Sequence, residues 1–210
     1  MPNIPQLLIL APILLMSLTV HELSHGLAAY WLGDDTARRA GRLTLNPLRH
    51  LDIMGLLAFI IFKFGWAKPV PVNPYNFKNF KRDMAITAAA GPLSNFLLAT
   101  LASLVGRAFG VTYMNLAMGN TSLFGVIIYL VVLYNLALGI FNLIPIPPLD
   151  GSKILGAFLP DAEYFRFMRW QRHGMFILIG ILLLGRLFNM PIIAAIIMPP
   201  LNFMLRLLLA

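Results

Sequence analysis

Long apolar runs separated by short polar connections dominate the sequence. Three of them are long enough to cross a bilayer as helices, because about 20 apolar residues span its hydrocarbon core: residues 6–32, 84–105 and 122–143. Residues 174–188 form a further span. The last apolar segment, 191–209, is interrupted at Pro199 and Pro200 and crosses fully or only halfway. The pattern predicts a membrane all-α protein, a multi-span helical bundle with about 4–5 spans.

The connection between the first and second spans follows a different pattern. Alternating apolar side chains over residues 42–45 predict a short strand. Residues 53–62 are apolar, but a run of ten residues is too short to cross, so we expect a re-entrant or interfacial segment. The fold class therefore includes a small β-strand region and a re-entrant segment between the first two spans.

Composition agrees with an integral membrane protein. Hydrophobic residues make up 59% of the chain and charged residues 11%, which is too few polar residues to cover a water-soluble globule. A length of 210 residues fits a single membrane domain over residues 1–210, without a separate soluble domain. The chain has no cysteine, so disulfides and thiolate metal ligands are excluded.

The basic residues indicate an orientation. The net charge of +8 comes from Lys and Arg scattered over the connections, as expected at an anionic membrane surface, and we predict no nucleic-acid partner. Connections 33–82 and 144–173 carry nine and four of the 16 basic residues, and the connection 107–121 carries one. Within them, residues 160–173 are basic and aromatic, as in an interfacial helix. By the positive-inside rule, the two basic connections are cytoplasmic in a plasma or inner membrane.

Residues 21–25, His-Glu-Leu-Ser-His, place three ionisable side chains inside the first span. On a helix, His21 and His25 share one face and can both reach a zinc ion, while Glu22 can act as general base on water. A chance match is expected roughly 0.0005 times in a chain of this composition. The alternative is a buried polar cluster that only joins helices, but ionisable groups in membrane helices usually mark functional sites.

A catalytic zinc ion needs a third protein ligand, and Asp150 is the candidate. It follows residues 145–148, where three prolines prevent a helix, and such backbone is tolerated in membranes where it lines a cavity. A helix N-cap is the alternative role for Asp150. His50 and His173 lie in charged connections and are expected at the surface.

Two further segments are expected near this chemistry. Small residues over positions 87–95 allow a close approach to the helix that carries His21, and Asn95 either bonds across that contact or locally. In the extended segment 68–73, Val70 and Val72 point their N–H groups to one edge. We expect this edge to receive an unwound substrate as an added strand, although pairing with the strand at 42–45 is equally compatible.

Three motifs together resemble the site-2 protease family of intramembrane zinc metalloproteases. They are the His-Glu-Leu-Ser-His run at 21–25, the Gly-Pro-Leu-Ser-Asn run at 91–95, and the Asn-x-x-Pro-x-Pro-x-x-Asp-Gly run at 142–151. The family's substrates are membrane-spanning segments of other proteins, often membrane-tethered regulators of transcription. No PDZ or CBS domain fits in this length, so the chain resembles a minimal catalytic core.

The resemblance also implies roles for individual residues. His21, His25 and Asp150 would bind one zinc ion per chain, and Glu22 would be the catalytic base and acid. Asn142 would position substrate or stabilise the tetrahedral intermediate. Membrane-spanning proteins and the lipid bilayer would be the partners. The distribution of basic residues, and not the resemblance, predicts that the site opens toward the cytoplasm.

Two function classes are compatible with these residues. The first is a zinc-dependent intramembrane endopeptidase, and the second is a non-proteolytic membrane metal transporter or metal-binding protein with the same ligands. Glu22 discriminates between them, because peptide hydrolysis needs a proton shuttle beside the metal ligands and transport does not. The sequence therefore favours the protease, and it leaves the substrate and the oligomeric state open.

Overall fold

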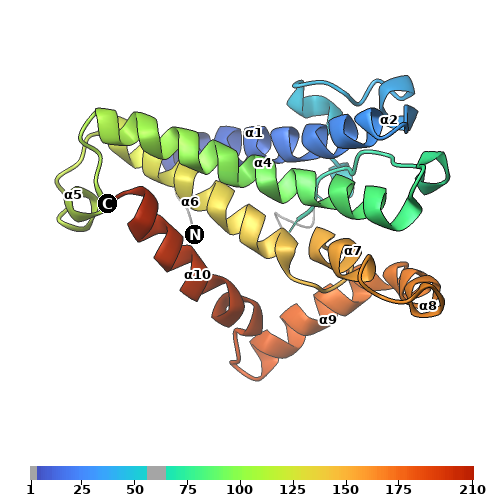
Figure 1. Cartoon of the computed structure of the whole chain (residues 1–210). Helices are drawn as coiled ribbons and strands as arrows, with labels where there is room; N and C mark the ends of the chain where they lie inside the picture. Colours follow the sequence, from blue (N-terminus) through green and yellow to red (C-terminus); the bar gives the residue numbers. More distant parts are fainter. Residues whose placement is uncertain (1–3, 56–64) are drawn as a thin grey trace. The chain divides into compact units, whose positions relative to one another are not determined.

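The computed structural model describes residues 4–55 and 65–210, and every regular element in these ranges is helical. In chain order the elements are α1 (Ile4–Trp31), α2 (Thr36–Arg39), η1 (Pro47–Arg49), η2 (Pro74–Asn76), α4 (Phe80–Ala108), α5 (Tyr113–Ala117), α6 (Leu123–Leu143), α7 (Asp150–Gly156), α8 (Asp161–Gln171), α9 (Gly174–Leu187) and α10 (Ile192–Leu208) (Figure 1). They form two compact units, Met1–Gly91 and Pro92–Ala210, and each unit is described by itself.

Three helices are long and apolar enough to cross a membrane: α1 from Leu8, α4 and α6. They coincide with the three long apolar runs of the sequence, and this confirms the all-α membrane class. The apolar helices α9 and α10 are shorter, so the predicted total of four or five spans stays a prediction. The expected re-entrant segment at 53–62 lies for the most part outside the described residues.

In the first unit, the polar connection after α1 folds back against the end of that helix. Ala29 of α1 is fully buried against Phe77 and Met84, with Leu32 and Val72 packed around them. This small apolar cluster holds the segment before α4 beside the C-terminal turns of α1. The connection therefore lies close to the residues that precede Ala29 on α1.

The predicted strand at 42–45 is wrong, since the described residues contain no strand. Side chains and turns bind the backbone groups that a ladder would need. The carbonyl of Thr44 accepts from Nε2 of His50 at 3.0 Å, and the carbonyl of Lys68 accepts from Arg42 at 2.7 Å. The backbone N–H of Lys68 donates to the carbonyl of His50 at 2.9 Å. Buried backbone groups need partners, but these partners need not be strands.

Asp34, just after α1, is the main anchor of this connection. Its buried carboxylate accepts hydrogen bonds from the backbone of Asn73 at 2.7 Å and from the side chain of Asn76 at 2.7 Å. It also accepts from the backbone and hydroxyl of Thr36. Burial raises the pKa of Asp34, but these hydrogen bonds outweigh it and hold the pKa below the ordinary value of 3.8. Asp34 therefore stays ionised and fixes the end of the segment 68–73.

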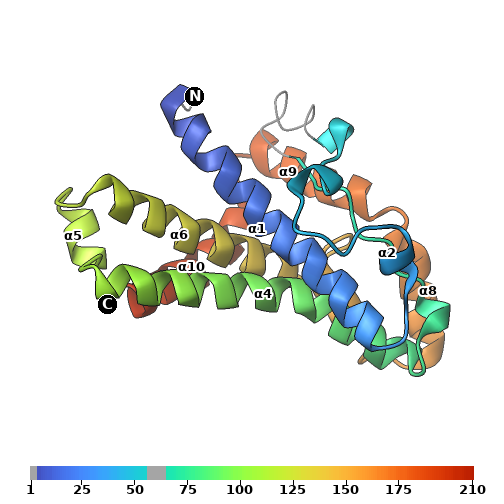
Figure 2. The same ribbon diagram turned by 90° about the horizontal axis from the view of Figure 1, so that it is seen from above.

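The second unit is built around the contact between α6 and α10 (Figure 2). Its buried core combines residues of α4, α6 and α10 with Val111 of a connection and Leu209 just after α10: Ala99, Val111, Ile128, Val132, Leu136, Leu201, Leu205 and Leu209. The buried amide of Asn95 on α4 donates to Oδ1 of Asn135 on α6 at 2.9 Å. Asn95 thus bonds across a helix contact, which is one of the two alternatives that the sequence predicts. The bond joins α4 to α6, however, and not to the helix that carries His21.

The last apolar segment differs from its prediction. Pro199 and Pro200 do not interrupt it, because α10 runs through both prolines from Ile192 to Leu208. A proline inside a helix costs about 3 kcal/mol. Leu201 and Leu205, which follow the prolines, are buried in the α6 contact, and this packing favours the continuous helix.

Candidate metal centre

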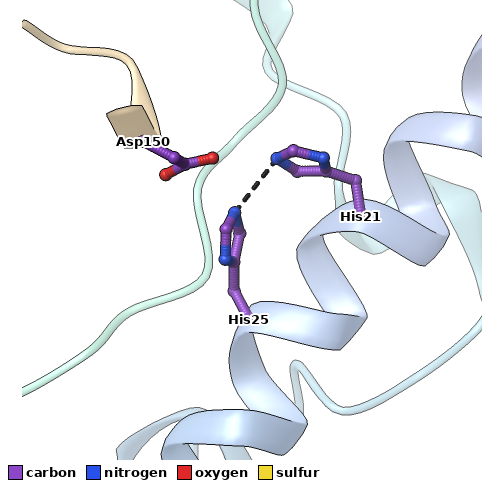
Figure 3. Close-up of side chains that lie close together, drawn as sticks. All are labelled: His21, His25 and Asp150. Atoms are coloured by element: carbon purple, nitrogen blue, oxygen red, sulfur yellow. Dashed lines mark hydrogen bonds between the residues drawn. The ribbon is translucent and has the colours of Figure 1, made fainter. Parts of the chain in front are cut away.

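His21 and His25 lie one turn apart on α1, and both side chains are buried. Their Nε2 atoms are 3.0 Å apart and their rings are nearly perpendicular, at 88° (Figure 3). Each imidazole presents its Nε2 atom to the other, so the two nitrogens converge on one small volume. This is the arrangement that the spacing of residues 21–25 predicts for two ligands of one metal ion.

The second ring nitrogen of His25 has a fixed partner. Nδ1 of His25 lies 2.7 Å from the backbone carbonyl of Thr87 on α4. A carbonyl can only accept, so Nδ1 carries the proton and Nε2 keeps its lone pair for a metal. The sequence does not predict this partner, because a main-chain carbonyl leaves no signature in the residue type.

Gly91 keeps the space beside the two histidines clear. A Cβ atom built at Gly91 would lie 2.5 Å from Nε2 of His25 and 2.6 Å from Nε2 of His21. These distances are far shorter than an ordinary contact, so any side chain at this position would displace the rings. The close approach to the His21 helix, expected from the small residues of this segment, is thereby confirmed at Thr87 and Gly91.

Glu22 is half-buried and points toward the connection that follows α1. Its Oε2 atom accepts a hydrogen bond of 2.9 Å from the backbone N–H of Val70. Glu22 therefore sits beside the histidine pair with its carboxylate held by a main-chain donor. Such a bond limits the carboxylate to few orientations, as a proton-transfer group requires.

The expected docking edge at Val70 and Val72 needs correction at Val70. Its N–H is bound to Glu22 and does not form part of an open edge. Val70 is also buried, with 8% of its surface exposed, and its side chain packs near Gly26 of α1. Between its anchors at Lys68 and Asn73, the segment 68–73 thus positions Glu22 in this structure. A role of Val72 toward substrate stays a prediction.

Asp150, the candidate third ligand, belongs to the second unit and is drawn in Figure 3. It is 5% exposed and lies in the first turn of α7, where Oδ1 accepts from Nζ of Lys153 at 3.0 Å. The N-cap position is Leu149, so the N-cap role weighed for Asp150 is wrong. Asp150 is instead the first residue of α7, and its carboxylate pairs with Lys153.

The chain before Asp150 is non-helical, as its prolines predict. α6 ends at Leu143, and residues 144–149 form bends and turns before α7 begins. Gly151 permits this geometry, because a Cβ there would collide with the carbonyls of Leu143 and Ile144. The sharp return of the chain onto the end of α6 fixes where Asp150 begins α7.

The structure also places the three other residues that the sequence singles out, and it agrees with only part of what is expected of them. Asn142 is half-buried and its amide donates to the carbonyl of Leu138 in its own helix at 3.0 Å, so a role toward substrate stays a prediction. His50, expected at the surface, is buried with 2% exposed, because its backbone and ring join Thr44 and Lys68 within the connection. His173 is exposed as expected.

Comparison with known proteins agrees with this centre. The family model described as peptidase family M50 matches residues 105–185, which include Asn142 and Asp150. A protein named as a candidate zinc metalloprotease, YwhC of Bacillus subtilis, is 36% identical over 193 residues, covering 90% of this chain and 84% of the relative. The chain belongs to the site-2 protease family, peptidase family M50. It is a zinc metalloprotease.

A second relative supports the same assignment. It is named as a candidate zinc metalloprotease, Rip2 of Mycolicibacterium smegmatis, and is 32% identical over 179 residues, covering 83% of this chain and 66% of the relative. The comparison with solved structures gives no significant match. Family M50 implies zinc, and the donor set of this member fits it: two converging imidazoles, one with its tautomer set by Thr87, beside a position that only glycine can fill.

Proposed function

We propose that this protease is an intramembrane endopeptidase that hydrolyses peptide bonds in or near membrane-spanning segments of other proteins. The observation that carries the proposal is the buried His21 and His25 pair on α1, a helix long and apolar enough to cross a membrane. A ligand pair at that place acts on peptide bonds that are themselves within the membrane. Charged or metal-binding groups in such a helix are costly and are kept for function.

We assign one zinc ion per chain to His21, His25 and Asp150. Two neutral imidazoles and one carboxylate form a common ligand set of catalytic zinc, which leaves one coordination position open. Asp150 supports this role by its burial and its place directly after a non-helical turn. The bond from Lys153 orients one carboxylate oxygen in the way that outer partners orient ligating carboxylates.

Glu22 is the proposed proton shuttle. Bound zinc would supply a Lewis acid that activates water and polarises the substrate carbonyl. Glu22 takes a proton from the attacking water and returns it to the leaving amine, while the N–H of Val70 holds the carboxylate in place. Thr87 keeps His25 in the tautomer that binds metal. Asn142, at the end of α6, is proposed to position substrate or stabilise the tetrahedral intermediate.

The proposed location is the cell membrane, with the site open to the cytoplasm. The support is the unequal distribution of basic residues, nine and four on connections 33–82 and 144–173 against one on 107–121. Membrane-spanning proteins are the proposed substrates. A helical substrate must unwind locally before its carbonyls can be attacked, because a helix binds them to its own backbone.

The test is cleavage in a defined membrane. Purified protein is reconstituted in liposomes with a single-span model substrate, and cleavage products are identified by mass spectrometry. Cleavage should stop when a chelator removes the metal and return when zinc is restored. Glu22→Gln should keep the zinc content of the wild type and lose at least about 100-fold of the cleavage rate, since general acid–base catalysis contributes roughly 10²–10⁴-fold.

Zinc content distinguishes the proposed zinc ligands from Glu22, the proposed proton-transfer residue. His21→Ala, His25→Ala and Asp150→Ala should each lower the bound zinc, measured by mass spectrometry of the metal, while Ser24→Ala should not. Ser24 is the matched control because its hydroxyl bonds only one turn back, to the carbonyl of Val20, at 2.7 Å. Full zinc occupancy in Asp150→Ala would remove Asp150 from the ligand set. Near-wild-type cleavage by Glu22→Gln would overturn the proposed mechanism.

A further inference from the structure

The surface of α8 carries a basic hollow that the proteolytic function does not use. It has a volume of about 400 Å³ and is lined by Arg166, Arg169, Trp170, Arg172 and His173. Its size lies within the range of about 300–1,000 Å³ that is usual for small-molecule sites. All five lining side chains are exposed.

The helix α8 presents this basic face outward because its other face is packed. Tyr164 is fully buried and its ring lies against Gly156 of α7, where a Cβ would be 3.3 Å from the ring. Gln171, seven residues further on, donates to the hydroxyl of Ser152 at 3.4 Å. Positions 166, 169 and 170 recur at helical spacing and form the opposite face, and Arg172 and His173 directly follow the end of the helix. The basic face is therefore held in place by the inner one.

The three arginines have no acidic partner in the described residues. The ion pairs found there join other basic groups to acids: Arg39 to Asp35, Arg82 to Asp83, and Lys153 to Asp150. The acids of α8, Asp161 and Glu163, lie in its first turn, ahead of the basic face. Three exposed guanidinium groups without carboxylates provide many donors for a phosphate group.

The position of the hollow in the chain indicates a ligand that belongs to a membrane. The apolar helix α9 begins at Gly174, directly after His173, and its first residue packs against Pro147, which a Cβ would approach to 2.8 Å. Large apolar groups beside the arginines are also exposed, with Phe165 at 58% and Trp170 at 60%. Basic clusters next to apolar helices, with aromatic residues among them, are typical contacts of anionic headgroups.

We propose that Arg166, Arg169 and Arg172 form a binding site for the phosphate of an anionic phospholipid, with Trp170 inserted beside its acyl chains. Each basic residue at an anionic surface favours binding by about fivefold, so three can enrich anionic lipid by up to roughly 100-fold. A free phosphate ion would use the same arginines but gain nothing from the exposed aromatic rings or from α9. The inference is independent of the proteolytic mechanism.

The test uses the fluorescence of Trp170 in the full chain. The other two tryptophans, Trp31 and Trp66, are replaced by Phe, and the protein is placed in nanodiscs of phosphatidylcholine. Brominated phosphatidylglycerol, whose acyl chains quench tryptophan, is titrated in, and brominated phosphatidylcholine is titrated in parallel. Half-maximal quenching should need about tenfold less of the anionic lipid than of the zwitterionic one.

Substitutions test whether the three arginines cause the preference for anionic lipid. Replacing Arg166, Arg169 and Arg172 together by Gln should make the two quenching curves coincide, whereas replacing all three by Lys should keep most of the preference. The matched control removes three exposed charges elsewhere, by Arg49→Gln, Lys78→Gln and Arg107→Gln, and should leave the preference unchanged. Retained preference in the Lys variant also shows that substitution on this face does not unfold α8.

Three results would overturn the proposal. Equal quenching by the two lipids in the protein that keeps all three arginines would show that no anionic-lipid site exists. Loss of preference in the control variant would show that overall charge, and not α8, attracts the lipid. Loss of preference when about 10 mM inorganic phosphate is added, at constant ionic strength, would assign the hollow to a free phosphate ion.

Discussion

Replacing Gly91 by alanine tests the geometry of the metal centre most directly. The added Cβ would lie 2.5 Å from Nε2 of His25, whereas ordinary contacts begin at 3.4 Å, so the ring or the helix must move by roughly 0.9 Å. Zinc–nitrogen bonds are about 2.0–2.1 Å long and tolerate about ±0.2 Å. The required displacement is several times that tolerance. Gly91→Ala should therefore lower zinc affinity by at least about 100-fold, more than the loss of an outer partner usually costs.

The same substitution should not unfold the protein by itself. Alanine is favoured over glycine inside a helix by about 1 kcal/mol, which opposes the strain of the contact. The assay is zinc content after dialysis against a chelator of known affinity, with circular dichroism to verify that the helices are intact. Gly180→Ala in α9 is the matched control, because a Cβ there meets nothing within 4 Å. A folded Gly91→Ala protein with the zinc affinity of the wild type would refute this reasoning.

Three further predictions concern the connection and the orientation. Asp34→Asn should lower the thermal midpoint at pH 7, since a hydrogen bond to a charged group contributes about 1.5–3 kcal/mol. The pKa of Asp34 is lower in the folded state, so the extra stability of the wild type over Asp34→Asn is present above pH 3.8, the ordinary pKa, and is lost as the pH falls through the folded pKa. An equal difference in thermal midpoint between the two proteins at pH 2 would contradict this. Val70→Pro removes the donor to Glu22 and should impair cleavage with zinc retained, whereas equal impairment by Val72→Pro would favour strand addition of substrate instead. In intact cells, Lys78→Cys should resist an impermeant thiol reagent and Asn120→Cys should react, and the reverse labelling pattern would invert the orientation.

The sequence by itself determined the features that follow from local periodicity and composition. Long apolar runs must be helical in a bilayer, because a helix binds all its own backbone groups, and this placed α1, α4 and α6. The spacing of His21 and His25 fixes two imidazoles on one helix face whatever the rest of the chain does. The prolines after Leu143 likewise end α6, since no helix can form there.

Tertiary structure decided the features that depend on main-chain groups and on distant segments. The carbonyl of Thr87 that orients His25 and the N–H of Val70 that holds Glu22 are present in nearly every residue, so no residue type marks them. The absence of a strand at 42–45 has the same cause, since side chains of Arg42 and His50 bind the backbone that a ladder would use. Alternation in sequence records which faces are apolar, and it does not record which partner each backbone group finds.

Helix α10 shows how packing overrides a local signal. Two adjacent prolines argue for a break on local grounds, and the cost of a proline inside a helix, about 3 kcal/mol, is real. Burying leucine side chains contributes about 1.5–3 kcal/mol each, and Leu201, Leu205 and Leu209 are all buried against the same core. The sequence therefore indicated the local cost at Pro199 and Pro200, and only the contact with α6 decided that the helix continues through them.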